Sequence, residues 1–265
     1  MKPDLDDSAH QADPADLATP FELDERQIQQ DRWRRLLIRV VALLLVLAFV
    51  PFVYSGTLRL FGLPSFQLLI ESIKLSRDSR YTSLCQSIVA VQAGNRQGTG
   101  FKIEPQDLIV TNAHILQDAG SVLVGIATND WHPALSWQQW PASDLALVQA
   151  DFQNLPGLEL ESTGHLPAVG DTVTVIGNPL GLFQIVSQAE FIGQAILPDR
   201  EGPVLEIRGP VFRGNSGSPV IDADGHVIGI LFAVAQGTAA NAKSSIAFVI
   251  PAAEILAKLE LFQSK

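Results

Sequence analysis

The sequence predicts an all-β fold, a sandwich or a barrel, for its C-terminal two thirds. From about Leu84 onward, short runs rich in Val and Ile alternate with Gly, Pro, Asn and Asp at close intervals. Many short strands separated by frequent turns are typical of these architectures. The expected strands are Ser87–Ala93, Gly100–Ile103, Asp107–Thr111, Val122–Ile126, Leu145–Gln149, Asp171–Ile176, Val204–Arg208, Val227–Phe232 and Ile246–Ile250.

The last part of the chain predicts a helix that closes the domain. Between Pro251 and Phe262, the apolar residues Ile255, Leu256 and Leu259 recur at helical spacing. Proline suits the first turn of a helix, where its missing N–H costs nothing. One apolar stripe indicates a helix that docks on the strands. We therefore expect a single folded domain over residues 81–265.

The N-terminal part predicts a tail, a membrane anchor and a connector. Residues 1–31 are acidic and poor in large apolar residues, which indicates a disordered tail. Within residues 32–55, the 19-residue run Leu36–Tyr54 carries one charge, Arg39, and is long enough to span a bilayer. Arginines before it predict a cytoplasmic tail and an exported domain. A cleaved signal peptide is the competing interpretation, disfavoured by the long tail and the missing cleavage pattern.

In the connector, residues 56–80, the stretch Leu58–Ile70 is apolar but interrupted by Gly62 and Pro64, and it is equally consistent with a membrane surface or the folded domain. The formal net charge of −10 argues against nucleic acid as a partner. Cys85 is the one cysteine, so no intrachain disulfide can form, and an apolar context indicates a buried thiol. No Cys/His metal-ligand spacing occurs, and we expect neither a metal nor a cofactor.

A glycine-bracketed turn, Arg213–Pro219, centres on Ser216. Gly214 and Gly217 allow positive φ angles, which can expose a hydroxyl and aim backbone N–H groups at its target. Taken alone, the heptapeptide is equally consistent with a hairpin turn and with a nucleophile. Serine is a weak nucleophile until a base takes its proton, so the second interpretation requires a histidine.

His114 is the histidine best placed to be that base, because it follows an expected strand at a strand-to-turn corner. His132, His165 and His226 fall in expected loops or bends, and His10 falls in the tail. Asp144 begins an apolar strand, where a charge is costly unless it has a partner. The other aspartates are expected turn formers; in particular, the segment Asp222–Gly225 lacks the later ligands of a calcium loop.

Five motifs in this order resemble the trypsin-like, chymotrypsin-fold serine proteases, and most closely the bacterial HtrA/Deg branch. They are Gly98–Phe101, Val110–His114, Asp144–Leu147, Gly177–Gly181 and Gly214–Pro219. The resemblance covers about residues 84–256 and follows the His, Asp, Ser order of chymotrypsin. It implies a double β-barrel with a C-terminal helix, here preceded by one transmembrane helix.

The resemblance also implies a role for each matching residue. His114 would be the general base and then the acid, Asp144 would orient it, and Ser216 would form the acyl-enzyme. The backbone N–H groups of Gly214 and Ser216 would form the oxyanion hole. Substrate would pair as an added strand along Ile230, Leu231, Phe232 and Ala233.

Three departures from the family concern activation and specificity. Asn215 replaces the Asp that pairs with a freed N-terminus in digestive members, which argues against zymogen-type activation. Ser218 replaces a common Gly, and Ile207–Phe212 replaces the segment that usually precedes the serine. The PDZ domain typical of the branch is not expected. Because residues 210–212 and 231–235 are uncharged, we expect cleavage after small or medium apolar side chains.

The sequence thus predicts a membrane-anchored serine endopeptidase in a bacterial inner membrane. Its domain would face the periplasm or another extracytoplasmic space and act on proteins or peptides, in quality control or regulated proteolysis. Homo-oligomerisation stays open. A catalytically silent protease-like fold, used for binding or as a chaperone, is the alternative from a different class. An esterase or lipase is disfavoured because those enzymes usually follow a Ser-Asp-His order.

Overall fold

The computed structural model describes residues 33–34, 36–47, 49, 66–76, 78–127, 130–152, 155–212, 214–235 and 245–264. The chain divides into two units, residues 1–57 and 58–265. In the first unit, residues 36–47 are helical and their apolar side chains are exposed. Within the described part of the chain, no helix is both long and apolar enough to cross a membrane. The predicted disordered tail and parts of the predicted anchor lie outside the described residues.

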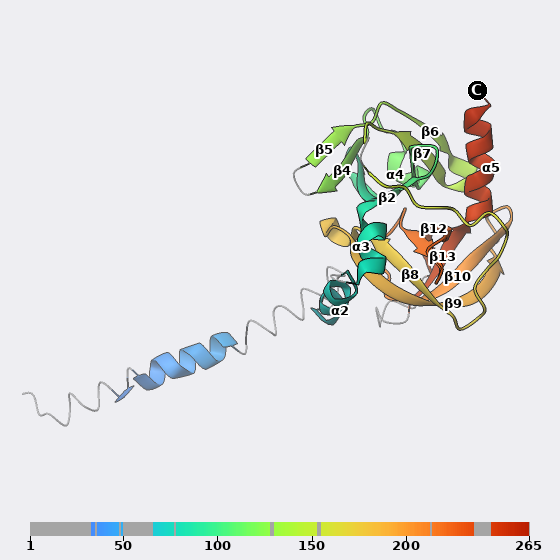
Figure 1. Cartoon of the computed structure of the whole chain (residues 1–265). Helices are drawn as coiled ribbons and strands as arrows, with labels where there is room; N and C mark the ends of the chain where they lie inside the picture. Colours follow the sequence, from blue (N-terminus) through green and yellow to red (C-terminus); the bar gives the residue numbers. More distant parts are fainter. Residues whose placement is uncertain are drawn as a thin grey trace, which may run out of the picture. The chain divides into compact units, whose positions relative to one another are not determined.

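The second unit is built on two antiparallel sheets, one above the other in Figure 1. The first sheet has seven strands in the order β5-β4-β1-β2-β3-β7-β6. Its strands are β1 (Ile88–Ala93), β2 (Arg96–Ile103), β3 (Leu108–Thr111), β4 (Leu123–Ala127), β5 (Asp130–Pro133), β6 (Ser136–Trp140) and β7 (Leu145–Gln149). This sheet is open, so the expected double barrel is confirmed for one half only.

The second sheet closes into a six-stranded barrel in the order β10-β13-β12-β11-β8-β9. Its strands are β8 (Thr172–Gly177), β9 (Ile185–Ile196), β10 (Pro203–Gly209), β11 (Pro219–Ile221), β12 (Val227–Val234) and β13 (Ser245–Pro251). Closure removes the unpaired edges that an open sheet leaves. The nine predicted strands all lie on observed ones, while β5, β6, β9 and β11 were not predicted.

Three apolar clusters form the core. One fills the barrel, with Phe191 and Leu205 among its members, and one packs on the seven-stranded sheet around Ile109. The third lies between the two sheets, because it joins Leu147 of β7 to Ile230 of β12. The functional site is built along this junction.

Among the described residues, three helices longer than a single turn flank the sheets. The predicted C-terminal helix is confirmed as α5 (Ala252–Gln263), and its Ile255 and Leu259 join the cluster between the sheets. The connector ends in α2 (Phe66–Ser76), which α3 (Ser79–Gln86) follows. The buried hydroxyl of Ser72 in α2 accepts a hydrogen bond of 2.9 Å from the backbone N–H of Val186 in β9. This end of the connector therefore packs on the folded domain.

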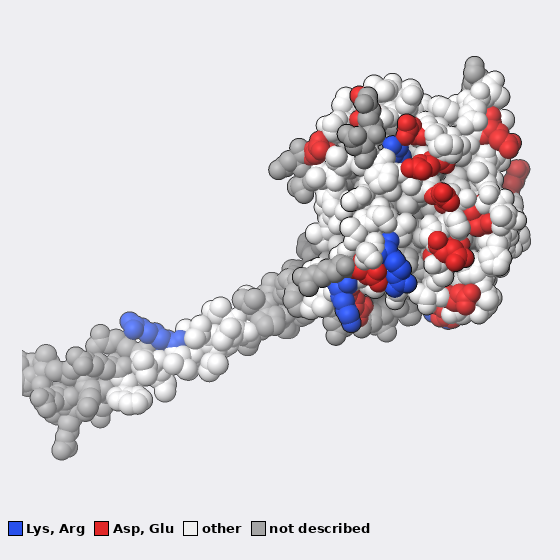
Figure 2. All heavy atoms as spheres, viewed as in Figure 1, with Lys and Arg blue, Asp and Glu red and all other residues white. Residues whose placement is uncertain are grey.

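On the face of the second unit seen in Figure 2, acidic side chains predominate among the charged ones. Asp and Glu side chains are distributed over it, and the few Lys and Arg side chains do not form a broad patch. This distribution is in keeping with the formal net charge of −10.

Candidate active site

His114 projects from a short helical turn, α4 (Ala113–Leu116), directly after β3. The neighbouring side chains Ala113, Ile115 and Leu116 are buried and hold the turn against the sheet. The imidazole instead faces outward, with 44% of its side chain exposed. The sequence-based expectation of a histidine at a strand-to-turn corner is therefore met.

Asp144 lies beside that imidazole, although 30 residues separate the two in sequence. Its carboxylate accepts a hydrogen bond of 2.9 Å from the backbone N–H of His114 and lies 2.9 Å, through Oδ2, from Nδ1 of the ring. An ionised carboxylate can only accept, so Nδ1 carries the proton and Nε2 is left as an acceptor. This is the tautomer that a general base requires.

The conformation of Asp144 is unusual and is held by its surroundings. It ends the 3₁₀ turn η2 (Pro141–Ser143) in the left-handed region, with φ 51° and ψ 38°. Its carbonyl accepts a hydrogen bond of 3.0 Å from the side-chain amide of Asn112, the residue that precedes α4. Non-glycine residues seldom adopt this conformation, and it persists only where the surroundings enforce it.

Ser216 lies at the tip of the predicted turn between Arg213, which is outside the described residues, and β11. Gly214 and Gly217 both have positive φ angles, 94° and 87°, as the sequence indicated. The N–H of Gly217 donates to the carbonyl of Leu231, at 2.9 Å. A Cβ at Gly217 would overlap the carbonyl oxygen of Thr99, so the turn requires glycine for space as well as for φ.

Thr99 in β2 connects the seven-stranded sheet to the serine turn. Its hydroxyl donates to the carbonyl of Gly214 at 2.8 Å and accepts from the N–H of Asn178 at 2.9 Å. Its backbone N–H donates to the carbonyl of Ser216 at 2.8 Å. Its carbonyl accepts from the hydroxyl of Thr111 at 2.7 Å. Because Thr99 is fully buried, this set of bonds fixes the turn on which the serine is presented.

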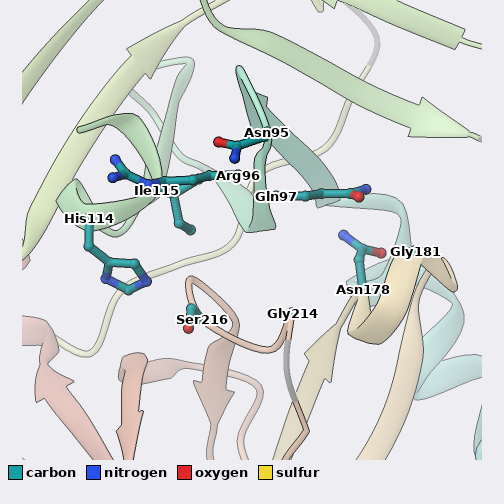
Figure 3. Close-up of a pocket in the computed structure, with 9 residues that line it drawn as sticks. All are labelled: Asn95, Arg96, Gln97, His114, Ile115, Asn178, Gly181, Gly214 and Ser216. Carbon is teal, nitrogen blue, oxygen red and sulfur yellow. The ribbon is translucent and has the colours of Figure 1, made fainter. Parts of the chain in front are cut away.

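His114 and Ser216 line the same pocket, of about 440 Å³, which also holds polar residues of the β1–β2 hairpin and Asn178, which follows β8. Figure 3 shows His114 reaching it from α4 and Ser216 from the turn before β11, so the two sheets meet there. The remaining lining residues are Asn95, Arg96, Gln97, Ile115, Asn178, Gly181 and Gly214. The structure thus brings together all three residues predicted for nucleophilic catalysis.

The two predicted oxyanion donors lie in the same turn. Within the described part of the chain, no acceptor is recorded for the backbone N–H of Gly214 or of Ser216. Both residues line the pocket. Backbone N–H groups beside a pocket are the kind of donor that stabilises the negatively charged oxygen of a developing tetrahedral intermediate, so the oxyanion hole stays a prediction for these two residues.

The predicted substrate strand is only partly available. The side chains of Ile230 and Leu231 are buried, and Ile230 pairs with Pro219 of β11 on one side and Ile250 of β13 on the other. The backbone of Leu231 bonds to the serine turn. Phe232 and Ala233 lie beyond the residues that β11 covers. The predicted main-chain pairing with a substrate would accordingly be restricted to the later part of β12.

The other candidate histidines lie elsewhere. His132 lies in β5, not in a loop as expected, and its Nε2 is 2.7 Å from Oδ1 of Asp130 on the same strand. His226 lies near Glu159 and Asp222 at a hairpin. Neither lines the pocket that contains Ser216. Cys85 is buried, as predicted, and burial raises the pKa of its thiol to about 11.

Thr99 and Asn112 have supporting roles that the sequence did not reveal. Both fall inside the motifs Gly98–Phe101 and Val110–His114, which marked them as part of a pattern without indicating a contact. Their partners are distant in sequence, 115 residues away for the Thr99 hydroxyl and 32 for the Asn112 amide.

Comparison with known proteins agrees with this geometry. The trypsin-like peptidase domain family matches residues 98–230. A DegP-like periplasmic serine endoprotease of Chlamydia pneumoniae is 35% identical over 159 residues, which are 58% of this chain and 32% of that protein. The serine protease HhoA of Synechocystis is 32% identical over 163 residues, 58% of this chain and 40% of that protein. The chain thus spans well under half the length of these relatives.

Solved structures give the same result. The active form of the Rv3671c protease of M. tuberculosis superposes with a TM-score of 0.60 and 26% identity, covering 70% of this chain and 85% of that one. The serine endoprotease of Yersinia pestis superposes with a TM-score of 0.55 and 25% identity, covering 68% of this chain and 65% of that one. DegP-like endoproteases are therefore among the proteins that this chain resembles. The chain itself belongs to the trypsin-like peptidase domain family.

Proposed function

We propose that this chain is a serine endopeptidase in which Ser216, His114 and Asp144 act as a catalytic triad. The observation that carries the proposal is the pair of contacts between Asp144 and His114, which leaves Nε2 as the acceptor on a pocket that also contains Ser216. Ser216 Oγ attacks the scissile carbonyl carbon while its proton passes to Nε2 of His114. The C–N bond then breaks, and the departing amine takes that proton.

Water completes the reaction by the same route. It attacks the acyl-enzyme carbonyl as its proton passes to Nε2, and the ester bond to Ser216 breaks as the serine regains a proton. The N–H groups of Gly214 and Ser216 would stabilise the oxyanion at both stages. Removal of one such donor typically lowers kcat by about 100- to 1,000-fold.

We further propose that the domain is anchored in a bacterial inner membrane by residues 32–55 and acts in the periplasm, in quality control or regulated proteolysis. The support is the apolar run itself, the exposed apolar side chains of helical residues 36–47 and the periplasmic relative from Chlamydia pneumoniae. Carbonate extraction of membranes would test the anchor, because a spanning segment stays in the membrane pellet. Release of the full chain by carbonate would contradict it.

The decisive experiment compares wild type with Ser216→Ala and Asp144→Asn, using fluorophosphonate labelling and hydrolysis of a peptide library. Wild type should be labelled and should cleave after small or medium apolar residues. Ser216→Ala should lose labelling, and Asp144→Asn should lose about 10⁴-fold in kcat, as expected when the base adopts the wrong tautomer. Cleavage only after Lys or Arg would contradict the specificity. Peptide binding without labelling would favour the catalytically silent alternative.

A further inference from the structure

Arg200 is a buried charge in an exposed part of the fold. It lies in the turn between β9 and β10, yet only 7% of its side chain is exposed. Removing a guanidinium from water is costly unless it finds hydrogen-bond partners. In a turn, the Arg200 side chain could remain in water without any cost in desolvation, yet it is directed into the protein. The contacts that it makes there therefore indicate its role.

The partners of Arg200 come from three separate elements. Nη1 donates to the carbonyl of Ser143 at 2.9 Å, and Nη2 donates to Oε2 of Glu254 in α5 at 2.6 Å. The guanidinium also lies over the ring of Phe232 in β12, 5.1 Å from its centroid. Arg200 therefore joins η2, the closing helix and the strand that we expect to pair with substrate.

The bond to Ser143 acts on the backbone of Asp144. Two peptide groups flank the Cα of Asp144, and their orientations define its φ and ψ. Arg200 holds the carbonyl of the first, the Ser143–Asp144 peptide, and Asn112 holds the carbonyl of the second. The N–H of Asp144 donates to Pro141 at 3.1 Å. Because the left-handed conformation is unfavourable for a residue with a Cβ, these contacts are what maintain it.

We propose that Arg200 is a positioning residue for Asp144, which is an inference that rests on the proposed function. Asp144 and His114 come from the seven-stranded half, whereas Ser216 and Arg200 belong to the barrel half. Through the Ser143 carbonyl, Arg200 fixes the position of the Asp144 carboxylate, in one half, relative to Ser216, in the other. Without it, the carboxylate retains its charge but loses its fixed direction toward Nδ1 of His114.

Four variants test this role by steady-state kinetics on a peptide substrate. Arg200→Met should lower kcat by about 10- to 100-fold, the scale expected for a small misplacement of a reacting group, with KM within about threefold of wild type. Glu254→Gln keeps the bond from Nη1 to Ser143 and should lose less than about threefold in kcat. Arg208→Met removes an exposed arginine of β10, paired with Glu190, and should change neither parameter.

The fourth variant, Arg200→Met with Glu254→Met, keeps the proposal falsifiable if the single variant folds poorly. Replacing both members of a buried ion pair by apolar residues is often neutral for stability, whereas removing one leaves an unpaired charge. The double variant should fold and show the kcat loss of Arg200→Met. A folded double variant with wild-type kcat would overturn the proposal.

A double-mutant cycle with Asp144→Asn shows whether Arg200 acts through Asp144. In the Asp144→Asn background, adding Arg200→Met should lower kcat by less than about threefold, because the oriented carboxylate is already absent. The low-field proton NMR signal of His114 Nδ1–H should weaken in Arg200→Met and persist in Arg208→Met. Fully multiplicative losses would overturn the proposal. Wild-type activity in Asp144→Asn itself would instead overturn the triad.

Discussion

Replacing Thr99 by valine tests whether the serine turn depends on a hydrogen-bond donor from the other sheet. Valine has the shape of threonine but no hydroxyl, so the substitution removes two bonds and little volume. The carbonyl of Gly214 loses its donor, and the N–H of Asn178 loses its acceptor. Both residues line the pocket, but Asn178 is buried, with 1% of its surface exposed, whereas Gly214 is half-buried and its carbonyl can regain a partner from water.

The magnitude follows from those two environments. A buried polar group left without a partner costs about 1 to 3 kcal/mol. With full loss at Asn178 and partial loss at Gly214, the free energy of unfolding should fall by about 2 to 4 kcal/mol. The turn that carries the proposed oxyanion donors is loosened but keeps both N–H groups, so kcat should fall by about 10- to 100-fold, less than for a lost donor.

Urea denaturation followed by tryptophan fluorescence would measure the first quantity, and peptide hydrolysis the second. Thr99→Ser keeps the hydroxyl and should retain most of the stability that Thr99→Val loses. Thr172→Val alters an exposed threonine at the start of β8 and should change stability by less than about 0.5 kcal/mol. If Thr99→Val lowers the free energy of unfolding no more than Thr172→Val does, the hydrogen bonds of the Thr99 hydroxyl do not hold the serine turn.

Two further predictions concern single residues. Gly217→Ala places a methyl group on the Thr99 carbonyl at a φ of 87°, so fluorophosphonate labelling should be abolished. Gly225→Ala, also at positive φ but with no atom nearby, should only lower the free energy of unfolding, by about 1 to 2 kcal/mol. Normal labelling of Gly217→Ala would refute the steric argument. Burial raises the pKa of Cys85 to about 11, whereas an unfolded thiol ionises at about 8.5, so the free energy of unfolding should fall as pH rises through that interval. Urea titrations at several pH values would measure this fall. In Cys85→Ala, the part of the fall that is due to the thiol should be absent.

The sequence predicted the strands that have a clear apolar pattern and missed those that do not. β5 and β6 are not predicted because Asp130–Pro133 and Ser136–Trp140 are rich in polar residues and tryptophan. β9 is missed although it is the longest strand among the described residues, since Gln188, Glu190 and Gln194 interrupt its apolar residues. The tertiary environment, which gives these segments partners, decides such cases.

The site was predictable where its chemistry depends on residue type and not where it depends on contact. His114, Asp144 and Ser216 were selected because a nucleophile, a base and an orienting carboxylate must be those kinds of residue. Nothing in the sequence indicated Arg200, because an arginine in a Pro-Asp-Arg-Glu-Gly turn is normally solvated. Its role arises only because the β9–β10 turn of the barrel reaches η2 of the other sheet.

The position of the site between the two sheets has a consequence for how activity responds to mutation. Ser216 belongs to the barrel half, but its turn is hydrogen-bonded to Thr99 of the seven-stranded sheet as well as to Leu231 of β12. Asp144 follows η2 in the seven-stranded half, but Arg200 of the barrel half holds the carbonyl before it. Each half therefore completes the geometry of the other. A change that shifts the sheets relative to each other, while leaving each one folded, should consequently lower kcat strongly and lower the free energy of unfolding only slightly.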